Sequence, residues 1–176
     1  YRIEGSALNQ RLCLLHWLRR ALRLCPHFVA QQFTPALKTA LKQHGIARPL
    51  YDDANLRALI NFCARKLQRQ FESRDVQFLQ LYLQYCLIQH HLGNTPEFSP
   101  VQRSWTQSRG EYFTAQEIVR HWKRRVPQGT HSDEQLFLAL LFMMLRTPDP
   151  VLDKHQQDQR LRRAIVRMIA RFRAQT

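Results

Sequence analysis

A nearly uninterrupted apolar segment at residues 76–88 is the feature that most constrains how this chain can fold. Only scattered glutamines interrupt it, the Ser73-Arg74-Asp75 start signal precedes it, and Gly93-Asn94 follows it. A helix of this composition is apolar nearly all round, and such a helix belongs at the centre of a bundle. The segment therefore predicts a helical bundle built around residues 76–92, which we expect to form its most buried helix.

The remaining composition also favours helices over strands and turns. The 176 residues include only five glycines against eight prolines, with many Leu, Gln, Arg and Ala residues. A hydrophobic content of 44% is enough to build a core. The longest apolar run, Leu136 to Leu145, has about half of the roughly 20 residues that a membrane-spanning helix needs. We expect an all-α fold with no membrane span.

Six further segments show helical spacing or a helix start signal, which gives about seven helices with a lead-in hairpin and a C-terminal helix. Thr34 followed by Pro35 predicts that the second hairpin helix begins there, and Gly45 ends it. Pro96 and Pro100 place one long loop between Gly93 and the helix that begins near Tyr112. The six segments are residues 8–25, 34–44, 52–67, 112–125, 132–145 and one that begins near Asp153.

Positive charge dominates the surface. Lys and Arg total 27 against 13 Asp and Glu, a formal charge of +14, so phosphate, acidic protein or anionic lipid are the plausible partners. Cations gather at Lys123-Arg124-Arg125 and along one face of the last helix. We favour a solvated face for that helix, with a nucleic-acid or partner surface as the alternative. The stripe consists of Arg160, Arg163, Arg167 and Arg171.

No motif for catalysis or metal binding is present in the sequence. There is no activated nucleophile, Gly-rich phosphate loop or acid/base pair, so we expect neither an enzyme nor a cofactor. Cys86 and His90 lie four residues apart with His91 adjacent, but no third ligand has recognisable spacing, and we expect no metal. The chain has four cysteines without CxxC pairing, which predicts reduced, mostly buried thiols in the cytoplasm.

Residues 52–144 resemble a PTS-regulation domain (PRD). The central segment 75–93 has the family's acidic start, apolar run and closing glycine. A second likeness runs through segment 111–118 and, after a loop, segment 133–141, in the family's order and separation. The resemblance implies a five-helix bundle of the kind found in pairs in bacterial transcription regulators that the sugar phosphotransferase system controls.

The same resemblance implies a departure from the family's switch. Family members are regulated by phosphorylation of histidines, and the matching positions hold Tyr82 and Leu141 here. Neither side chain accepts a phosphoryl group as an imidazole does. His90 and His91 lie two turns beyond Tyr82 and are the nearest substitutes. We therefore expect a PRD scaffold without the usual phosphorylation site.

The resemblance also predicts a domain order and partners. Residues 1–5 would end a preceding winged-helix domain, with a possible strand at Tyr1 to Ile3, and residues 6–50 would form a helical lead-in. Residues 51–148 would form the PRD-like domain, and residues 149–176 a linker and the first helix of a following PRD. We expect a homodimer, DNA contact through the winged-helix domain, and docking of another regulatory protein. The alternative is a nucleic-acid-binding module that uses a basic helical face.

Overall fold

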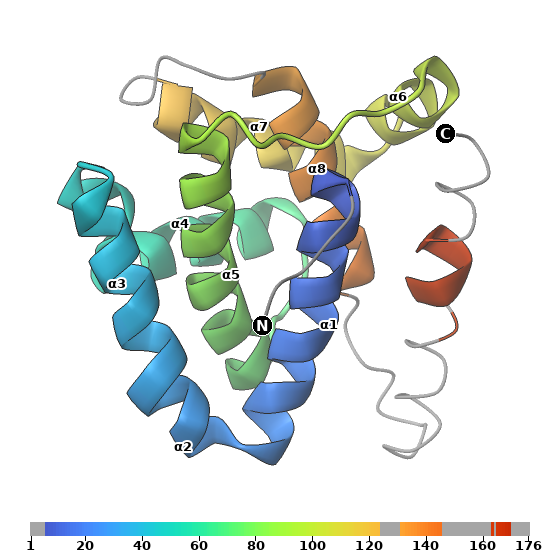
Figure 1. Ribbon diagram of the computed structural model, residues 1–176. Coiled ribbons are helices and arrows are strands. Elements are labelled where there is room, and N and C mark those ends of the chain that lie inside the picture. Colours follow the sequence, from blue (N-terminus) through green and yellow to red (C-terminus); the bar gives the residue numbers. More distant parts are fainter. Residues whose placement is uncertain (1–5, 124–130, 146–162, 164, 170–176) are drawn as a thin grey trace.

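The computed structural model describes residues 6–123, 131–145, 163 and 165–169. Its described part is all-helical, which confirms the predicted fold class (Figure 1). Residues 163 and 165–169 are helical as well. The elements are α1 (Ala7–Leu24), α2 (Pro26–Phe28), a π-helical turn (Val29–Phe33), α3 (Thr34–Gln43), a 3-10 turn (Arg48–Leu50), α4 (Asp53–Lys66), α5 (Ser73–His91), α6 (Pro100–Gln107), α7 (Gly110–Lys123) and α8 (His131–Met144).

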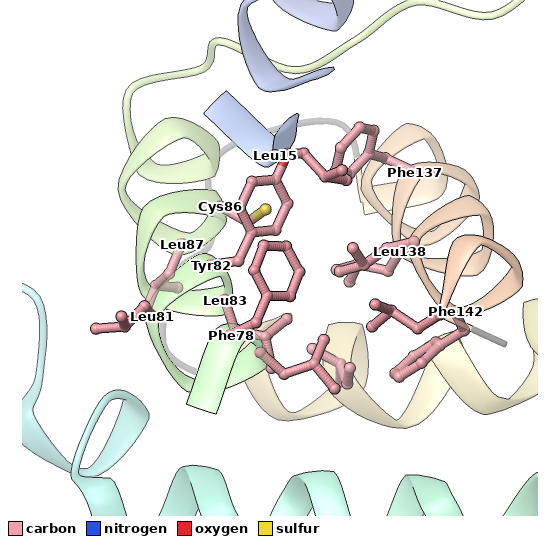
Figure 2. Close-up of a cluster of buried hydrophobic side chains, with 14 of the residues drawn as sticks. Leu15, Phe78, Leu81, Tyr82, Leu83, Cys86, Leu87, Phe137, Leu138 and Phe142 are labelled. Atoms are coloured by element: carbon pink, nitrogen blue, oxygen red, sulfur yellow. The ribbon is translucent and has the colours of Figure 1, made fainter. Parts of the chain in front are cut away.

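Helix α5 occupies the middle of the molecule, as its composition predicts. It contacts α1, α3 and α4, and Figure 1 shows it between α3 and α1. Phe78 and Tyr82 are fully buried, with ring centroids 5.1 Å apart. Figure 2 shows these two rings in the space between α5 and α8, level with Phe137 and Leu138. The core is therefore shared by these two helices.

Helix α8 is buried more completely than α5, contrary to the sequence expectation. Every residue from Asp133 to Leu145 is buried, whereas α5 leaves Gln77 exposed. Polar side chains at the start of α8 form hydrogen bonds to α6 and α7. Arg103 donates to Asp133 at 2.6 Å, and Gln135 donates to the Tyr112 carbonyl at 3.0 Å. Because α6 and α7 both pack on α8, its polar residues Asp133, Glu134 and Gln135 are enclosed together with its apolar remainder.

The second hairpin helix begins at Pro26 and not at Thr34, so the predicted N-cap at Thr34 is wrong. Helical backbone continues from α2 through the π turn into α3. The N–H of Thr34 donates to the carbonyl of Val29, five residues back. Pro35 has no N–H and its ring clashes with a regular helix, and the widened π turn just before it accommodates the ring. Gly45, at φ +67°, ends the helix as predicted.

The predicted long loop after Gly93 contains a helix, α6. Ser99 caps it, because its side chain accepts a hydrogen bond from the N–H of Gln102 at 3.2 Å. Gln102 in turn accepts from the N–H of Ser99 at 2.7 Å, which completes a capping box with Pro100 in the first turn. This Ser-Pro-x-Gln capping signal was present in the sequence. The loop prediction was wrong because it treated Pro100 as a helix breaker, whereas a proline is compatible with the first turn of a helix.

Half of the cysteines depart from the prediction of buried thiols. Cys63 and Cys86 are buried, but Cys13 and Cys25 are exposed, because they lie on the solvent side and at the end of α1. Within the described residues, no helix is both long and apolar enough to cross a membrane. The predicted strand at residues 1–3 lies outside the described residues, as does most of segment 149–176, and the domain boundaries stay predictions.

Candidate functional site

The two positions predicted to match the family's histidines are closed to solvent. Tyr82 on α5 is 0% exposed and Leu141 on α8 is 1% exposed. The Tyr82 hydroxyl donates a hydrogen bond to the backbone carbonyl of Arg11, with 2.5 Å between the oxygens. Burial raises the pKa of the Tyr82 phenol well above its ordinary value. The phenol is therefore a protonated, fully enclosed hydrogen-bond donor.

Arg11 carries its charge from α1 into this interior. Its guanidinium donates to both carboxylate oxygens of Glu134 at the start of α8, at 2.7 Å to Oε2, and also to the Asn94 carbonyl at 3.0 Å. The Arg11 side chain is 1% exposed and that of Glu134 is 0% exposed. The guanidinium also lies 5.0 Å from the centre of the Phe137 ring. A bidentate ion pair thus connects α1 to α8 inside the core.

His90, near the end of α5, lies close to the same carboxylate. Its Nδ1 is 3.4 Å from Oε1 of Glu134, and the side chain is fully buried. The imidazole stacks on the Trp122 ring of α7, with centroids 5.9 Å apart. Arg11, Glu134 and His90 form one group, which we call the buried charge cluster. It joins three helices that are far apart in the sequence.

Burial and charge act in opposite directions on Glu134. Burial by itself would raise the pKa of its carboxyl, but the hydrogen bonds and charges of Arg11 and His90 together hold it below the ordinary value of 4.5. Nearby, burial raises the pKa of the Cys86 thiol to about 12. Glu134 is therefore ionised and Cys86 protonated at neutral pH.

The other predicted site residues do not join this cluster. His91 is half-buried at the end of α5, its ring centroid 6.0 Å from that of His44. No group of three or more metal-ligating side chains occurs among the residues that the structure describes. Arg163 and Arg167 are exposed beside the buried Ile165, in agreement with the predicted amphipathic face. Lys123 ends α7, whereas Arg124, Arg125, Arg160 and Arg171 lie outside the described residues.

Sequence reasoning missed the buried charge cluster. Arg11 and Glu134 are 123 positions apart, and no spacing rule connects residues at that distance. A signal was present on α1, because Arg11 falls within the apolar face formed by Leu8, Leu12 and Leu15. A charged residue on a buried face needs an opposite charge elsewhere. The sequence offered several carboxylates but no means of choosing among them.

Comparison with known proteins adds two matches. A protein-family model described as PRD domain matches residues 57–144. The stationary phase-inducible protein CsiE of Escherichia coli (strain K12) is 62% identical over 173 residues, which cover 98% of this chain. The chain spans 41% of the length of that relative. No solved structure gives a significant match.

Both matches bear on the geometry above. They confirm the resemblance seen in residues 52–144, and segments 8–13, 32–38 and 82–86, which resemble CsiE, lie within the longer match. Glu134 and His90 fall inside the PRD match, whereas Arg11 precedes it by many residues. The buried charge cluster therefore combines residues of the family's own region with one from the lead-in helix.

We expect each half of the Arg11–Glu134 pair to depend on the other for stability. Arg11→Met or Glu134→Met alone should lower the free energy of unfolding by about 3–5 kcal/mol, because each leaves a buried charge without its partner. The double variant should lose clearly less than the sum. Urea unfolding followed by circular dichroism measures all four proteins. The exposed pair Lys38–Asp53, at 3.0 Å, is the control and should show a coupling of about 0–1 kcal/mol. Additive losses at Arg11 and Glu134 would contradict this expectation.

The pKa of Glu134 predicts how stability depends on pH. Because the native pKa is held below 4.5, protonation is harder in the folded state than in the unfolded state. The stabilisation is therefore fully present above about pH 4.5 and is lost as the pH falls through the lower native pKa. Unfolding free energies of the wild type and Glu134→Gln, measured from pH 7 downward, should converge only below pH 4.5. A constant difference across that range would show that Glu134 does not titrate as described.

Proposed function

The chain belongs to the PRD domain family, and on that premise we propose that it is a regulatory and interaction domain of a bacterial transcriptional regulator. In this proposal the domain lacks the usual phosphorylation switch and acts by dimerisation or by docking a partner protein. It performs no catalysis of its own and needs no cofactor. DNA contact belongs to a winged-helix domain that would precede residue 6.

The enclosed state of Tyr82 and Leu141 is the observation that carries this proposal. Phosphoryl transfer between proteins needs an exposed, nucleophilic imidazole at the position that the carrier reaches. A buried phenol bonded to the Arg11 carbonyl and a buried hydrocarbon offer neither exposure nor nucleophilicity. His90 is equally buried and turned toward Glu134, so it does not replace them. Of these positions, only His91 reaches the surface.

Control by abundance and by contact follows from the loss of the switch. The related CsiE is named for its induction in stationary phase. We propose that the protein that contains this chain is likewise governed by how much of it is made and by which partner it meets. The domain would then work in the cytoplasm as a scaffold in a single conformation, and its helix faces would provide the contacts.

A second function, direct nucleic-acid binding, is favoured by one observation. Arg163 and Arg167 are both exposed, one turn apart, while Ile165 between them packs into the core. Side chains in this arrangement can contact successive phosphates. Arg167 also donates to the Arg163 carbonyl at 3.3 Å, so part of its hydrogen-bonding capacity is already used. This alternative therefore ranks second.

We expect this domain to take up no phosphoryl group from phosphotransferase carriers. The chain is incubated with the purified carrier proteins and labelled phosphoenolpyruvate, and acid-labile label on it is measured. The labelled carrier in the same reaction is the positive control. Stoichiometric labelling of the chain would contradict the proposal. Loss of that label in a His90→Ala, His91→Ala double variant would then place the site at the end of α5.

We also expect a homodimer held by helix faces. Phe113 and Val166 are 58% and 60% exposed, and such side chains supply apolar contact area outside the core. Light scattering should give twice the 21.0 kDa mass of the chain at high concentration. A strict monomer, for both this chain and the full-length protein, would exclude dimerisation.

Salt dependence separates the two candidate functions. Phosphate contacts release counterions, so nucleic-acid binding should weaken steeply between about 50 and 200 mM salt. Association through packed helices should change little over the same range. Binding of a labelled duplex to the 176-residue chain, measured at both salt concentrations, is expected to be weak throughout. Tight binding with a steep salt slope that Arg163→Glu and Arg167→Glu abolish would favour the alternative.

A further inference from the structure

An apolar surface lies on the hairpin formed by α1 and α2. Trp17 is 44% exposed, Leu24 69% and Phe28 51%, and Phe33 is half-buried beside them. The Trp17 ring centroid lies 6.5 Å from that of Phe28 and 5.6 Å from that of Phe33. We call these four residues the hairpin patch. In Figure 1 the turn between α1 and α2 lies at the lower end of the molecule.

The hairpin patch is not needed to build the core. Leu15, Leu18 and Leu22, on the opposite face of α1, already bury that helix against the bundle. Trp17 and Leu24 are seven positions apart, so they lie along one solvent-facing stripe of α1. Leaving such side chains in water has a cost in free energy that grows with their exposed apolar area. Exposed apolar side chains gathered on one surface are typical of interaction sites.

The charged residues of the hairpin itself have one sign. Residues 6–51 contain no Asp or Glu, while seven Lys and Arg residues occur there. Several of these side chains have acidic partners on other helices: Arg11 binds Glu134, Arg19 lies 3.8 Å from Asp75 of α5, and Lys38 pairs with Asp53 of α4 at 3.0 Å. Arg20 and Arg23 are exposed on α1, where they border the Trp17–Leu24 stripe along one edge. The patch is therefore an apolar strip with a positive rim. The seven are Arg11, Arg19, Arg20, Arg23, Lys38, Lys42 and Arg48.

We infer that the hairpin patch docks an acidic amphipathic helix of a partner protein. The apolar face of that helix would cover Trp17, Leu24 and Phe28, and its carboxylates would lie beside Arg20 and Arg23. Anchors at i, i+3, i+4 and i+7 of the incoming helix suit a strip of this kind. This inference rests on the proposed function, because it locates the partner contact that the function requires.

Charge and ring geometry distinguish this partner from two others. A second copy of the hairpin would bring the same positive rim, and like charges facing each other oppose association. A single-stranded nucleic acid would use open aromatic faces for stacking. Here the Trp17 and Phe28 rings meet edge to face at 79°, and the most exposed member, Leu24, has no ring. An apolar segment with acidic flanks matches both properties of the patch.

The test uses labelled synthetic helical peptides and the 176-residue chain, with binding measured by fluorescence anisotropy. One peptide has Leu and Phe on one face and Glu on its flanks, a second has Lys in place of Glu, and a third is a scrambled acidic sequence. The acidic amphipathic peptide should bind, and the other two should bind roughly tenfold or more weakly. The exposed Trp17 should also give a blue-shifted emission when that peptide covers it.

Matched variants locate the contact. Two double variants are made, Trp17→Ser with Phe28→Ser and Arg20→Glu with Arg23→Glu. Each should weaken binding of the acidic peptide by roughly tenfold or more. Arg57→Glu with Arg65→Glu changes the net charge equally on exposed positions of α4 and should leave binding unchanged. Leu92→Ser, at the far end of α5, is the control for exposed apolar side chains. Circular dichroism melting confirms that each variant folds.

Several results would overturn the inference. Equal binding of the acidic and basic peptides would do so. An equal loss of peptide affinity in the α4 control variant and in the Arg20, Arg23 variant would also do so. A labelled single-stranded oligonucleotide whose binding is lost in the Trp17, Phe28 variant would assign the patch to nucleic acid. A dimer that dissociates in that variant would make the patch a self-interface. These outcomes leave the proposed function standing, whereas acid-labile labelling of a histidine would remove that function and leave peptide binding unaffected.

Discussion

The rest of this structure depends on the ion pair between Arg11 and Glu134. Both charges are removed from water, so neither is tolerable without the other, and their pairing determines how α1 lies against α8. Three further contacts reinforce that register: the Asn94 carbonyl accepts from Arg11, the Tyr82 hydroxyl donates to the Arg11 carbonyl, and Phe137 lies under the guanidinium. We expect this pair to contribute less to net stability than to specifying one arrangement of the helices. Helix α1 is thereby part of the folded core, although the PRD match begins at residue 57.

The same pair connects the interior to the proposed function. The Arg11 carbonyl accepts a hydrogen bond from the Tyr82 hydroxyl, and Glu134 neutralises the Arg11 charge. The polar groups around the predicted switch positions therefore have partners inside the domain. In the proposed function, a domain closed in this way presents no group at these positions to a phosphoryl carrier. Its surface is then what remains available for regulation. Helix α1 contributes to both the core and the surface, since Arg11 on one face is buried and Trp17 on another is exposed.

Local pattern was sufficient for most of the helices and insufficient where two local signals conflicted. At Ser99-Pro100 the proline suggested a loop while the Ser99 and Gln102 pair specified a cap, and the cap prevailed because a proline is harmless in a first turn. At Thr34-Pro35 the proline was predicted to occupy the first turn of a new helix, whereas the helical backbone had already begun at Pro26. The backbone stayed helical by widening into a π turn, a solution that packing of Val29 and Leu37 into the core makes favourable. Both errors concerned a proline whose effect on the backbone depended on the residues around it.

The sequence by itself determined the helical class and the central position of α5, because these follow from composition and periodicity. Its resemblance to the PRD family, which the family model confirms, predicts in addition that Tyr82 and Leu141 stand at two of the family's histidine positions. Only the tertiary structure decided that Glu134, among several carboxylates, is the partner of Arg11, that His90 faces the same group, and that Trp17, Phe28 and Phe33 gather on one surface. The physical reason is distance along the chain. Helix periodicity relates residues within a few turns, whereas the choice of a buried partner more than a hundred positions away is made by the packing of whole helices.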